Sequence, residues 1–266
     1  MKTTLQISVL AAVSLLTVMN NLQGQNSFPS YASHVATEVA TQASPCPSAL
    51  KAQVFGNDRW VALGSDGKLR CSADGIEWSS VYLPLESFLR GVAFGNGQFV
   101  AVGGPYASGG SVILTSINGR CWKLHPSPSK QVLHAVAYSG DRFIAVGASG
   151  TILTSKSVQR WEKQASGTDA TLAAIAYGNG TCVAGGDDGV MLSSRDTLHW
   201  TRQASGTSRY VGHLAFAHKR FVATIADLQL ESSDGSCWQA IAVTAVPAGG
   251  RLARTNVTDS QASPAK

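Results

Sequence analysis

Charged residues are scarce in this chain. Only 14% of its 266 residues are Asp, Glu, Lys or Arg, and the formal net charge is +5. So mild an excess, without a stripe of aromatic and basic residues, argues against nucleic acid as a partner. The five cysteines form no Cys-x-x-Cys pair and no His-x-x-x-His spacing occurs, so the sequence predicts no metal site and no cofactor.

Helical periodicity is also weak after residue 50. Short runs rich in Val, Ile, Phe, Tyr and Thr take its place, separated by turn residues. One stretch shows the pattern clearly, with runs at 133–138, 142–147, 151–155 and 162–164. Four short strands are predicted there, and the chain is expected to be all-β.

Tryptophan marks a repeat of this four-strand unit. Five tryptophans are spaced 44, 39, 39 and 38 residues apart: Trp78, Trp122, Trp161, Trp200 and Trp238. A period near 40 residues built from short strands is typical of a β-propeller, in which each repeat forms one blade. We predict a single domain of five four-stranded blades. A closed five-bladed ring is expected; an irregular extra blade, or an open array completed by a partner, is the alternative.

The repeats fix the expected boundaries. The propeller should span residues 49–246, with blades at about 50–88, 89–131, 132–170, 171–210 and 211–246. Segments 26–48 and 247–266 are rich in small and polar residues and are predicted to be a disordered linker and a disordered tail.

Residues 1–25 are typical of a secretory signal, because Lys2 precedes a mostly apolar run from Leu5 to Met19. An uncleaved N-terminal anchor is the alternative, and it would be the only membrane contact. The sequence therefore predicts an exported monomer, periplasmic or extracellular. Export permits disulfides, but Cys121 and Cys237 fall at the same position of different copies and Cys182 replaces a core Phe, so no disulfide framework is expected.

Each tryptophan closes a turn with a pattern of its own. Residues 72–78 and 232–238 both read Ser, any, Asp, Gly, any, any, Trp. Residues 116–122 have Asn for Asp, 194–200 lack the Gly, and 155–161 keep only the Ser and the Trp. The pattern resembles the Asp-box, or bacterial neuraminidase repeat, of sialidase-like and photosystem-assembly-factor-like propellers.

This resemblance implies a turn between the third and fourth strands, away from any catalytic face. The Asp side chain can accept hydrogen bonds from its own turn, and the Trp can pack between adjacent sheets. We interpret these positions as structural: Ser72, Asp74, Gly75, Trp78, Asn118, Trp122, Trp161, Asp196, Trp200, Asp234, Gly235 and Trp238.

Propeller ligands usually bind at the mouth of the central channel, where each first strand begins. Aligning the copies places Lys51, Arg90, His134, Ala173 and Gly212 at one equivalent position, with His213 one step later. Three of the five are basic or potentially basic, so around a ring they would form a positive mouth for an anionic group of the ligand.

The loop 104–110 of the second copy is longer than its counterparts and contains Tyr106. An insertion in one blade of a regular repeat tends to mark the working face. Arg209 and Tyr210 precede the first strand of the fifth copy and would join that face. The candidate ligand-binding residues are Lys51, Arg90, His134, His213, Tyr106, Arg209 and Tyr210.

No catalytic residue is predicted. Sialidase-like chemistry implies three arginines, a Tyr paired with a Glu, and an acidic Asp. Arg90 and Arg209 are available, but no third Arg occupies an equivalent position, and Glu86 is the only nearby Glu by sequence. We expect a non-catalytic propeller that binds a protein partner or a surface glycan. A glycoside hydrolase or lyase on the same scaffold is the alternative.

Overall fold

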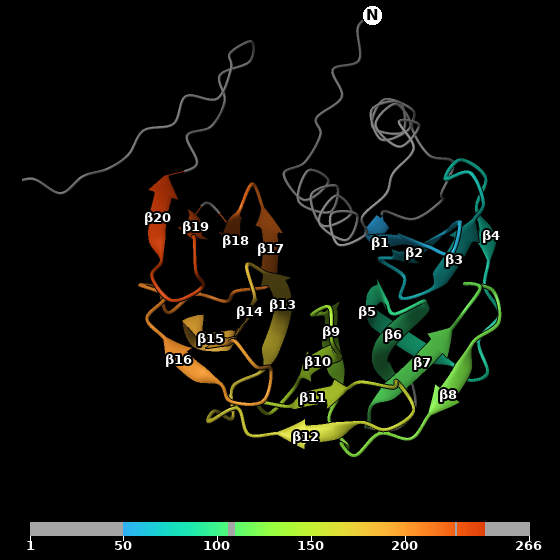
Figure 1. Cartoon of the computed structure of the whole chain (residues 1–266), viewed down its shortest axis with the longest axis horizontal. Helices are drawn as coiled ribbons and strands as arrows, with labels where there is room; N and C mark the ends of the chain where they lie inside the picture. Colours follow the sequence, from blue (N-terminus) through green and yellow to red (C-terminus); the bar gives the residue numbers. More distant parts are fainter. Residues whose placement is uncertain (1–49, 106–109, 227, 243–266) are drawn as a thin grey trace, which may run out of the picture.

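The computed structural model describes residues 50–105, 110–226 and 228–242. They form five four-stranded antiparallel sheets, each running in chain order from its first strand to its fourth. The predicted all-β fold of five four-stranded blades is confirmed, and it is a β-propeller (Figure 1).

The strands of the first three blades follow the sequence pattern closely. Blade 1 contains β1 (Leu50–Gly56), β2 (Arg59–Gly64), β3 (Leu69–Ser72) and β4 (Ser79–Ser80). Blade 2 contains β5 (Ser87–Gly95), β6 (Gln98–Pro105), β7 (Val112–Ser116) and β8 (Lys123–His125). Blade 3 contains β9 (Leu133–Tyr138), β10 (Phe143–Gly147), β11 (Ile152–Ser155) and β12 (Glu162–Gln164).

The last two blades repeat the arrangement. Blade 4 contains β13 (Leu172–Gly178), β14 (Thr181–Gly186), the short 3₁₀ turn η1 (Asp187–Gly189), β15 (Met191–Ser194) and β16 (Thr201–Gln203). Blade 5 contains β17 (His213–Ala217), β18 (Arg220–Ile225), β19 (Leu228–Ser232) and β20 (Gln239–Ala242). No helix in the described part of the chain is long and apolar enough to cross a membrane.

The antiparallel order gives the propeller two distinct ends. The first strands lie innermost, around the axis (Figure 1). At one end, called here the mouth end, each first strand begins and the loop between the second and third strands lies. At the other, called the turn end, lie the hairpins between first and second strands and the turns between third and fourth strands.

The core consists of four apolar clusters, each between two consecutive blades. The middle strands are buried on both faces because each blade is covered by a neighbour on either side. Leu114 of blade 2 packs toward blade 1, for example, and the adjacent Ile113 packs toward blade 3; both are 0% exposed. The tryptophan of each later blade lies against the preceding blade, as Trp122 and Trp161 do.

Close contacts at the turn end complete these interfaces. A Cβ placed on Gly56 would lie 2.3 Å from the Phe94 ring of the next blade, and one on Gly178 would lie 2.1 Å from Phe216. Only glycine allows such an approach of ring to backbone. The side chain of Asn57 also crosses to blade 2, donating to the carbonyl oxygens of Gly97 and Ile117 at 2.8 Å.

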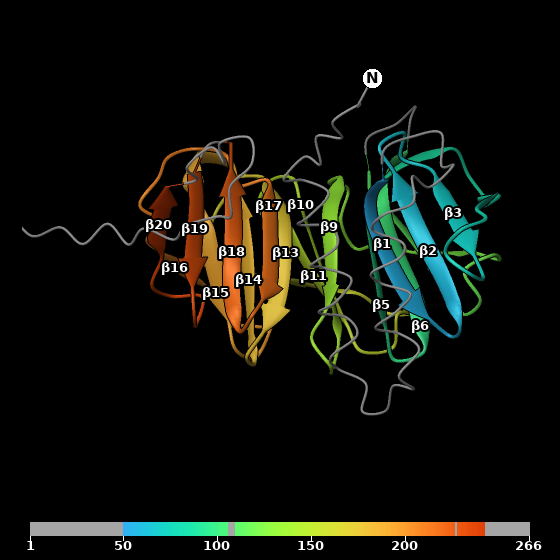
Figure 2. The same cartoon turned by 90° about the horizontal axis from the view of Figure 1, so that it is seen from above.

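The ring is open between blade 5 and blade 1. Five blades in a closed ring would share five interfaces, but the described residues form four core clusters and none joins β17 to β1. Figures 1 and 2 show these two strands on opposite sides of the opening. The described residues therefore do not form the expected closed ring.

Candidate binding site at the channel mouth

A β-bulge places one extra residue at the start of the innermost strand in four blades. In β1 the register passes from Leu50 opposite Gly64 to Ala52 opposite Leu63, so Lys51 has no partner. The same break leaves one residue unpaired in each of the next three blades: Arg90, His134 and Ala173. A bulge bends its strand and re-aims one side chain.

The four unpaired residues are those that the alignment of the copies placed at one equivalent position. The fifth, Gly212, lies directly before β17, and His213 pairs with Thr224 at the first rung of that strand. The mouth position is thus the same structural feature in four blades and is occupied by Lys, Arg, His and Ala.

The basic residues predicted at the mouth lie within electrostatic range of one another. Burial, and then the positive charge of Arg90, lower the pKa of Lys51, although its side chain still reaches solvent. Burial lowers the pKa of His134, followed by the charges of Arg90 and Lys51. Burial and then Lys51 lower the pKa of His213. The four side chains, which come from β1, β5, β9 and β17, therefore form one cluster.

Two further residues belong to this site. The charge of Asp187, in the loop after β14, acts in the opposite direction on the pKa of His134. It is the smallest of the effects on that ring. Burial, then Asp187, raises the pKa of Tyr210, whose phenol is 55% exposed. We call the six residues the mouth cluster: Lys51, Arg90, His134, Asp187, Tyr210 and His213.

The mouth cluster holds an unbalanced positive charge. With both histidines favoured in the neutral form, its fixed charges are two cations and one carboxylate. Arg90 is stacked over the Phe88 ring at 5.3 Å, and its buried Nε has no hydrogen-bond partner among the described residues. Buried donors normally have a hydrogen-bond partner. The Nε–H of Arg90 can therefore donate a hydrogen bond to an acceptor on a bound ligand.

The loops around the mouth are held by the next blade. Gly67 of the loop between β2 and β3 accepts a hydrogen bond from the Leu89 N–H at 3.1 Å. Gly186 likewise accepts from the Val211 N–H at 2.9 Å, next to Asp187. These backbone bonds fix the loop positions, so the site is pre-organised rather than assembled on binding.

The remaining predicted mouth residues are less closely tied to the cluster. Arg209 is exposed, and its backbone N–H donates to Thr207 Oγ1 at 3.1 Å. Tyr106 lies outside the described residues, so its predicted place beside the mouth remains a prediction. Asp187 was not among the predicted ligand-binding residues, because Asp-Asp-Gly is an ordinary turn sequence. Its electrostatic effect on His134 becomes visible only in the fold.

The tryptophan-terminated turns, unlike the mouth cluster, are held by hydrogen bonds within each turn. In blade 1, Asp74 Oδ1 accepts from the Ile76 and Glu77 N–H groups at 2.9 and 3.0 Å. The Trp78 ring N–H donates to the Gly75 carbonyl at 3.1 Å. The two backbone bonds lower the pKa of Asp74 to about 2.

Blades 2, 4 and 5 place Asn118, Asp196 and Asp234 in the same bonds. Blade 3 has no such acceptor, and Ser155 Oγ donates instead to the Arg160 carbonyl. In blades 1, 2, 4 and 5 one side-chain oxygen accepts both backbone bonds within its own turn.

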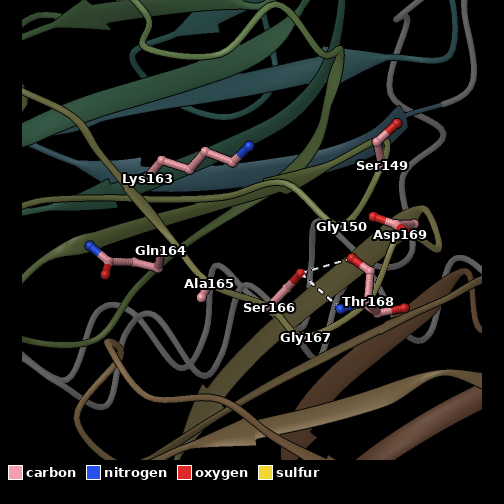
Figure 3. Close-up of a pocket in the computed structure, with 9 residues that line it drawn as sticks. All are labelled: Ser149, Gly150, Lys163, Gln164, Ala165, Ser166, Gly167, Thr168 and Asp169. Carbon is pink, nitrogen blue, oxygen red and sulfur yellow. Dashed lines mark hydrogen bonds between the residues drawn. The ribbon is translucent and has the colours of Figure 1, made fainter.

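A hollow of about 360 Å³ lies beside blade 3 and its connection to blade 4, and no residue of the mouth cluster lines it. Ser149, Gly150 and residues 163–169 line it (Figure 3). Ser166 Oγ donates to the Thr168 carbonyl at 3.0 Å within that wall. The same sequence, Gln-Ala-Ser-Gly-Thr, recurs at 203–207 with the same bond. This repetition marks the wall as part of the blade connection.

The described residues contain no group of three or more His, Cys, Asp or Glu side chains that could hold a metal. Four cysteines fall within the described ranges and all are free: Cys71 and Cys182 buried, Cys121 and Cys237 exposed. Burial raises the pKa of Cys182 to about 12, so this thiol stays protonated in the core. Cys46 lies outside the described residues.

Solved propellers are similar to this chain in structure. The structure of YCF48 bound to D1 peptide has 16% identity, 76% of this chain and 71% of that chain covered, and a TM-score of 0.59. A streptogramin B lyase has 13% identity, the same coverage and a TM-score of 0.61. The WD40 domain of Pan2 from Neurospora crassa has 12% identity, 74% and 66% coverage, and a TM-score of 0.53.

At such low identity these likenesses show the fold alone. One neighbour holds a peptide and another is a lyase, so the same scaffold serves both binding and catalysis in those proteins. No protein-family profile matches the chain, and no curated protein matches it.

Proposed function

We propose that this protein is an exported, non-catalytic β-propeller that binds a protein partner through an acidic segment at the mouth cluster. The observation that carries the proposal is the convergence of Lys51, Arg90, His134 and His213, from four separate blades, with Asp187 as the carboxylate among them. Cations held close together repel one another, and an anionic ligand would relieve that repulsion.

A peptide is favoured over a glycan by the neighbour whose structure contains a bound peptide. An extended acidic segment would place its carboxylates against Arg90 and Lys51, and its apolar atoms against the exposed ring of Tyr210. A surface glycan carrying carboxylate or sulfate groups is the second candidate, because Tyr210 also offers a ring on which a sugar can stack.

A hydrolase has less support. Glycoside hydrolysis commonly uses two carboxyl groups about 5–10 Å apart. The electrostatic contacts that define the mouth, within the described ranges, include a single carboxylate, that of Asp187. We further propose that the tryptophan-terminated turns that contain Asp are Asp-boxes with a folding role only, because Oδ1 of the Asp accepts two backbone bonds within the turn.

The test is parallel screening of the purified chain against an acidic peptide array and a glycan array. Lys51→Gln/Arg90→Gln should weaken capture by at least about tenfold, because each contact is charge-assisted. Lys123→Gln/Lys163→Gln is the matched control, since it removes the same charge from the exposed outer strands β8 and β12. Equal loss in both variants, or turnover of a glycan, would overturn the proposal.

A further inference from the structure

The tryptophan-terminated turn of blade 3, residues 155–161, has the same backbone as the other four turns. The residue after the Asp position is left-handed in all five blades, with φ between 57° and 80°. In blade 3 that residue is Val158, and the Trp161 ring N–H donates to its carbonyl at 3.0 Å, as in blades 1, 2 and 4. A β-branched residue rarely adopts this conformation. The surrounding structure therefore holds blade 3 in the shared turn.

Two backbone N–H groups of this turn lack the acceptor that their equivalents have. In the other four blades one Asp or Asn oxygen accepts from both groups, at 2.8–3.2 Å. Blade 3 has Ser157 at that position, and its hydroxyl makes no hydrogen bond within the described residues. Because the backbone is the same, the N–H groups of Gln159 and Arg160 converge on one point to which the described part of the chain brings no acceptor.

Blade 4 shows what the same position does when it carries a carboxylate. Asp196 Oδ1 accepts from the Leu198 and His199 N–H groups at 2.9 and 2.8 Å. Its Oδ2 lies 2.6 Å from Nδ1 of the His199 ring. The ring, followed by the two N–H groups, holds the pKa of Asp196 well below its usual range. This position of the turn therefore stabilises a negative charge.

Blade 3 has basic residues at the same two flanking positions, without the carboxylate. Lys156 stands where blade 4 has Arg195, and Arg160 stands where it has His199. An arginine at this position is longer than the histidine that reaches the carboxylate in blade 4. Both basic side chains line a hollow of about 220 Å³ at the turn end of blade 3. Its other lining residues include Arg142, Ser157 and Glu162.

The charges around this hollow leave it positive. Asp141 Oδ2 lies 3.1 Å from Arg142 and 3.4 Å from Lys156, and Glu162 Oε1 lies 3.4 Å from Arg160 Nε. Three cations thus face two carboxylates. The side chains of Lys156 and Arg160 are 64% and 85% exposed. Ion pairs between exposed groups are weak, so both cations can exchange their partners for a ligand.

We propose that the turn of blade 3 binds an oxyanion at the position that the Asp196 carboxylate occupies in blade 4. The N–H groups of Gln159 and Arg160 donate to it, the Arg160 guanidinium takes the place of the His199 ring, and Lys156 adds a second positive charge. The oxyanion is a free ion such as sulfate or a carboxylate on a partner. The site lies at the end opposite the mouth cluster and does not depend on the proposed function.

Titration of the purified full chain, followed through its backbone amide NMR signals, tests the proposal. Sulfate added at constant ionic strength should shift the Gln159 and Arg160 signals along a saturable curve. Ser157→Asp supplies a carboxylate at the motif position, so the two donors are already occupied. The apparent dissociation constant of sulfate should therefore rise at least about tenfold.

Ser233→Asp is the matched control. It adds the same charge to the turn of blade 5, where Asp234 already accepts from both N–H groups, and should leave the response of blade 3 unchanged. A hexaglutamate peptide distinguishes the two sources of the anion. If it shifts the same two signals at lower concentration than sulfate does, the site takes an acidic side chain of a partner; if only sulfate shifts them, it takes a free ion.

Two results would rule the site out. One is the absence of any saturable shift of Gln159 and Arg160 with either probe. The other is the same response in Ser157→Asp as in the unaltered chain, which would mean that the two donors are not the contact. The signals of Arg90 and His134 in the same spectra report on the mouth separately, so failure at one end is distinguishable from failure at the other.

Discussion

The turn end and the mouth end are built from the same strands but are constrained in opposite ways. At the turn end four of the five copies make the same pair of bonds within the turn, as Asp74 and Asp234 do. At the mouth end the copies differ, and the positive charge of Arg90 adds to burial in lowering the pKa of Lys51. The contrast indicates that the turn end holds the blades in place, whereas the mouth end is free to vary with the ligand.

Removing an aromatic side chain from each end should give the largest difference. Trp161 is 5% exposed and its ring N–H donates to the Val158 carbonyl at 3.0 Å. Trp161→Ala should lower the free energy of unfolding by about 3–5 kcal/mol. Tyr210→Ala at the mouth should change it by no more than about 0.5 kcal/mol. Urea unfolding measures both, and comparable losses would show the contrast to be wrong.

A smaller loss is expected from the close ring contact at the turn end. Gly178→Ala places a Cβ 2.1 Å from the Phe216 ring and should cost about 1–3 kcal/mol. Blade 5 has Ala217 at the equivalent position, next to the opening. Ala217→Gly, the reverse change, should cost only about 0.5–1 kcal/mol through backbone entropy. The same urea titration compares them, and a neutral Gly178→Ala would contradict the assigned contact.

Acid should weaken the turn end through Asp74. The folded-state pKa of this carboxyl, about 2, is below its ordinary value of 3.8, so its stabilising effect is complete above pH 4. That effect is lost as the pH falls from about 4 through 2. Asp74→Asn should flatten the decline, since Asn118 makes the same two bonds uncharged in blade 2. Thermal unfolding between pH 5 and 2 measures it; an unchanged slope in the variant would count against this assignment.

The mouth end should show the smallest effect on stability. The pKa values of His134 and His213 are lowered by burial and by nearby cations, so the folded chain binds fewer protons than the unfolded chain. Stability should therefore fall slightly as the pH drops below about 6.5. His134→Gln/His213→Gln should remove this decline. An acidic ligand should reverse it by favouring the protonated rings, which calorimetric titration at pH 7.5 and 5.5 would detect.

Much of the fold could be predicted from the sequence because every blade repeats the same constraints. The tryptophan spacing counted the blades, and the turn residues placed the strands of blade 3 almost to the residue. The expected closed ring was wrong for the described residues for a physical reason. Arg70 and Gln53 replace the apolar residues that other blades turn toward the preceding blade, which is visible only when one knows which side chains of a strand point that way.

The mouth was predicted in part. Aligned positions found Lys51, Arg90 and His134, because a bulge recurs at the same place in the first four copies. The alignment did not reveal the bulge, since an extra residue that these copies share leaves no gap between them. Tyr210 was among the predicted mouth residues, from its place before the first strand of the fifth copy. Asp187 was not, because its approach to His134 depends on how consecutive blades are rotated, which no local pattern encodes.

The bulge in the innermost strands of blades 1 to 4 has a consequence for how such a protein can change. Its extra residue lacks a partner in the β-ladder, so it can be exchanged without shifting the register of the blade. Lys, Arg, His and Ala already occupy it in blades 1 to 4. Randomising only these four codons would thus sample a diverse set of recognition surfaces on one unaltered scaffold. Selection could retarget the mouth while leaving the turns and their tryptophans untouched.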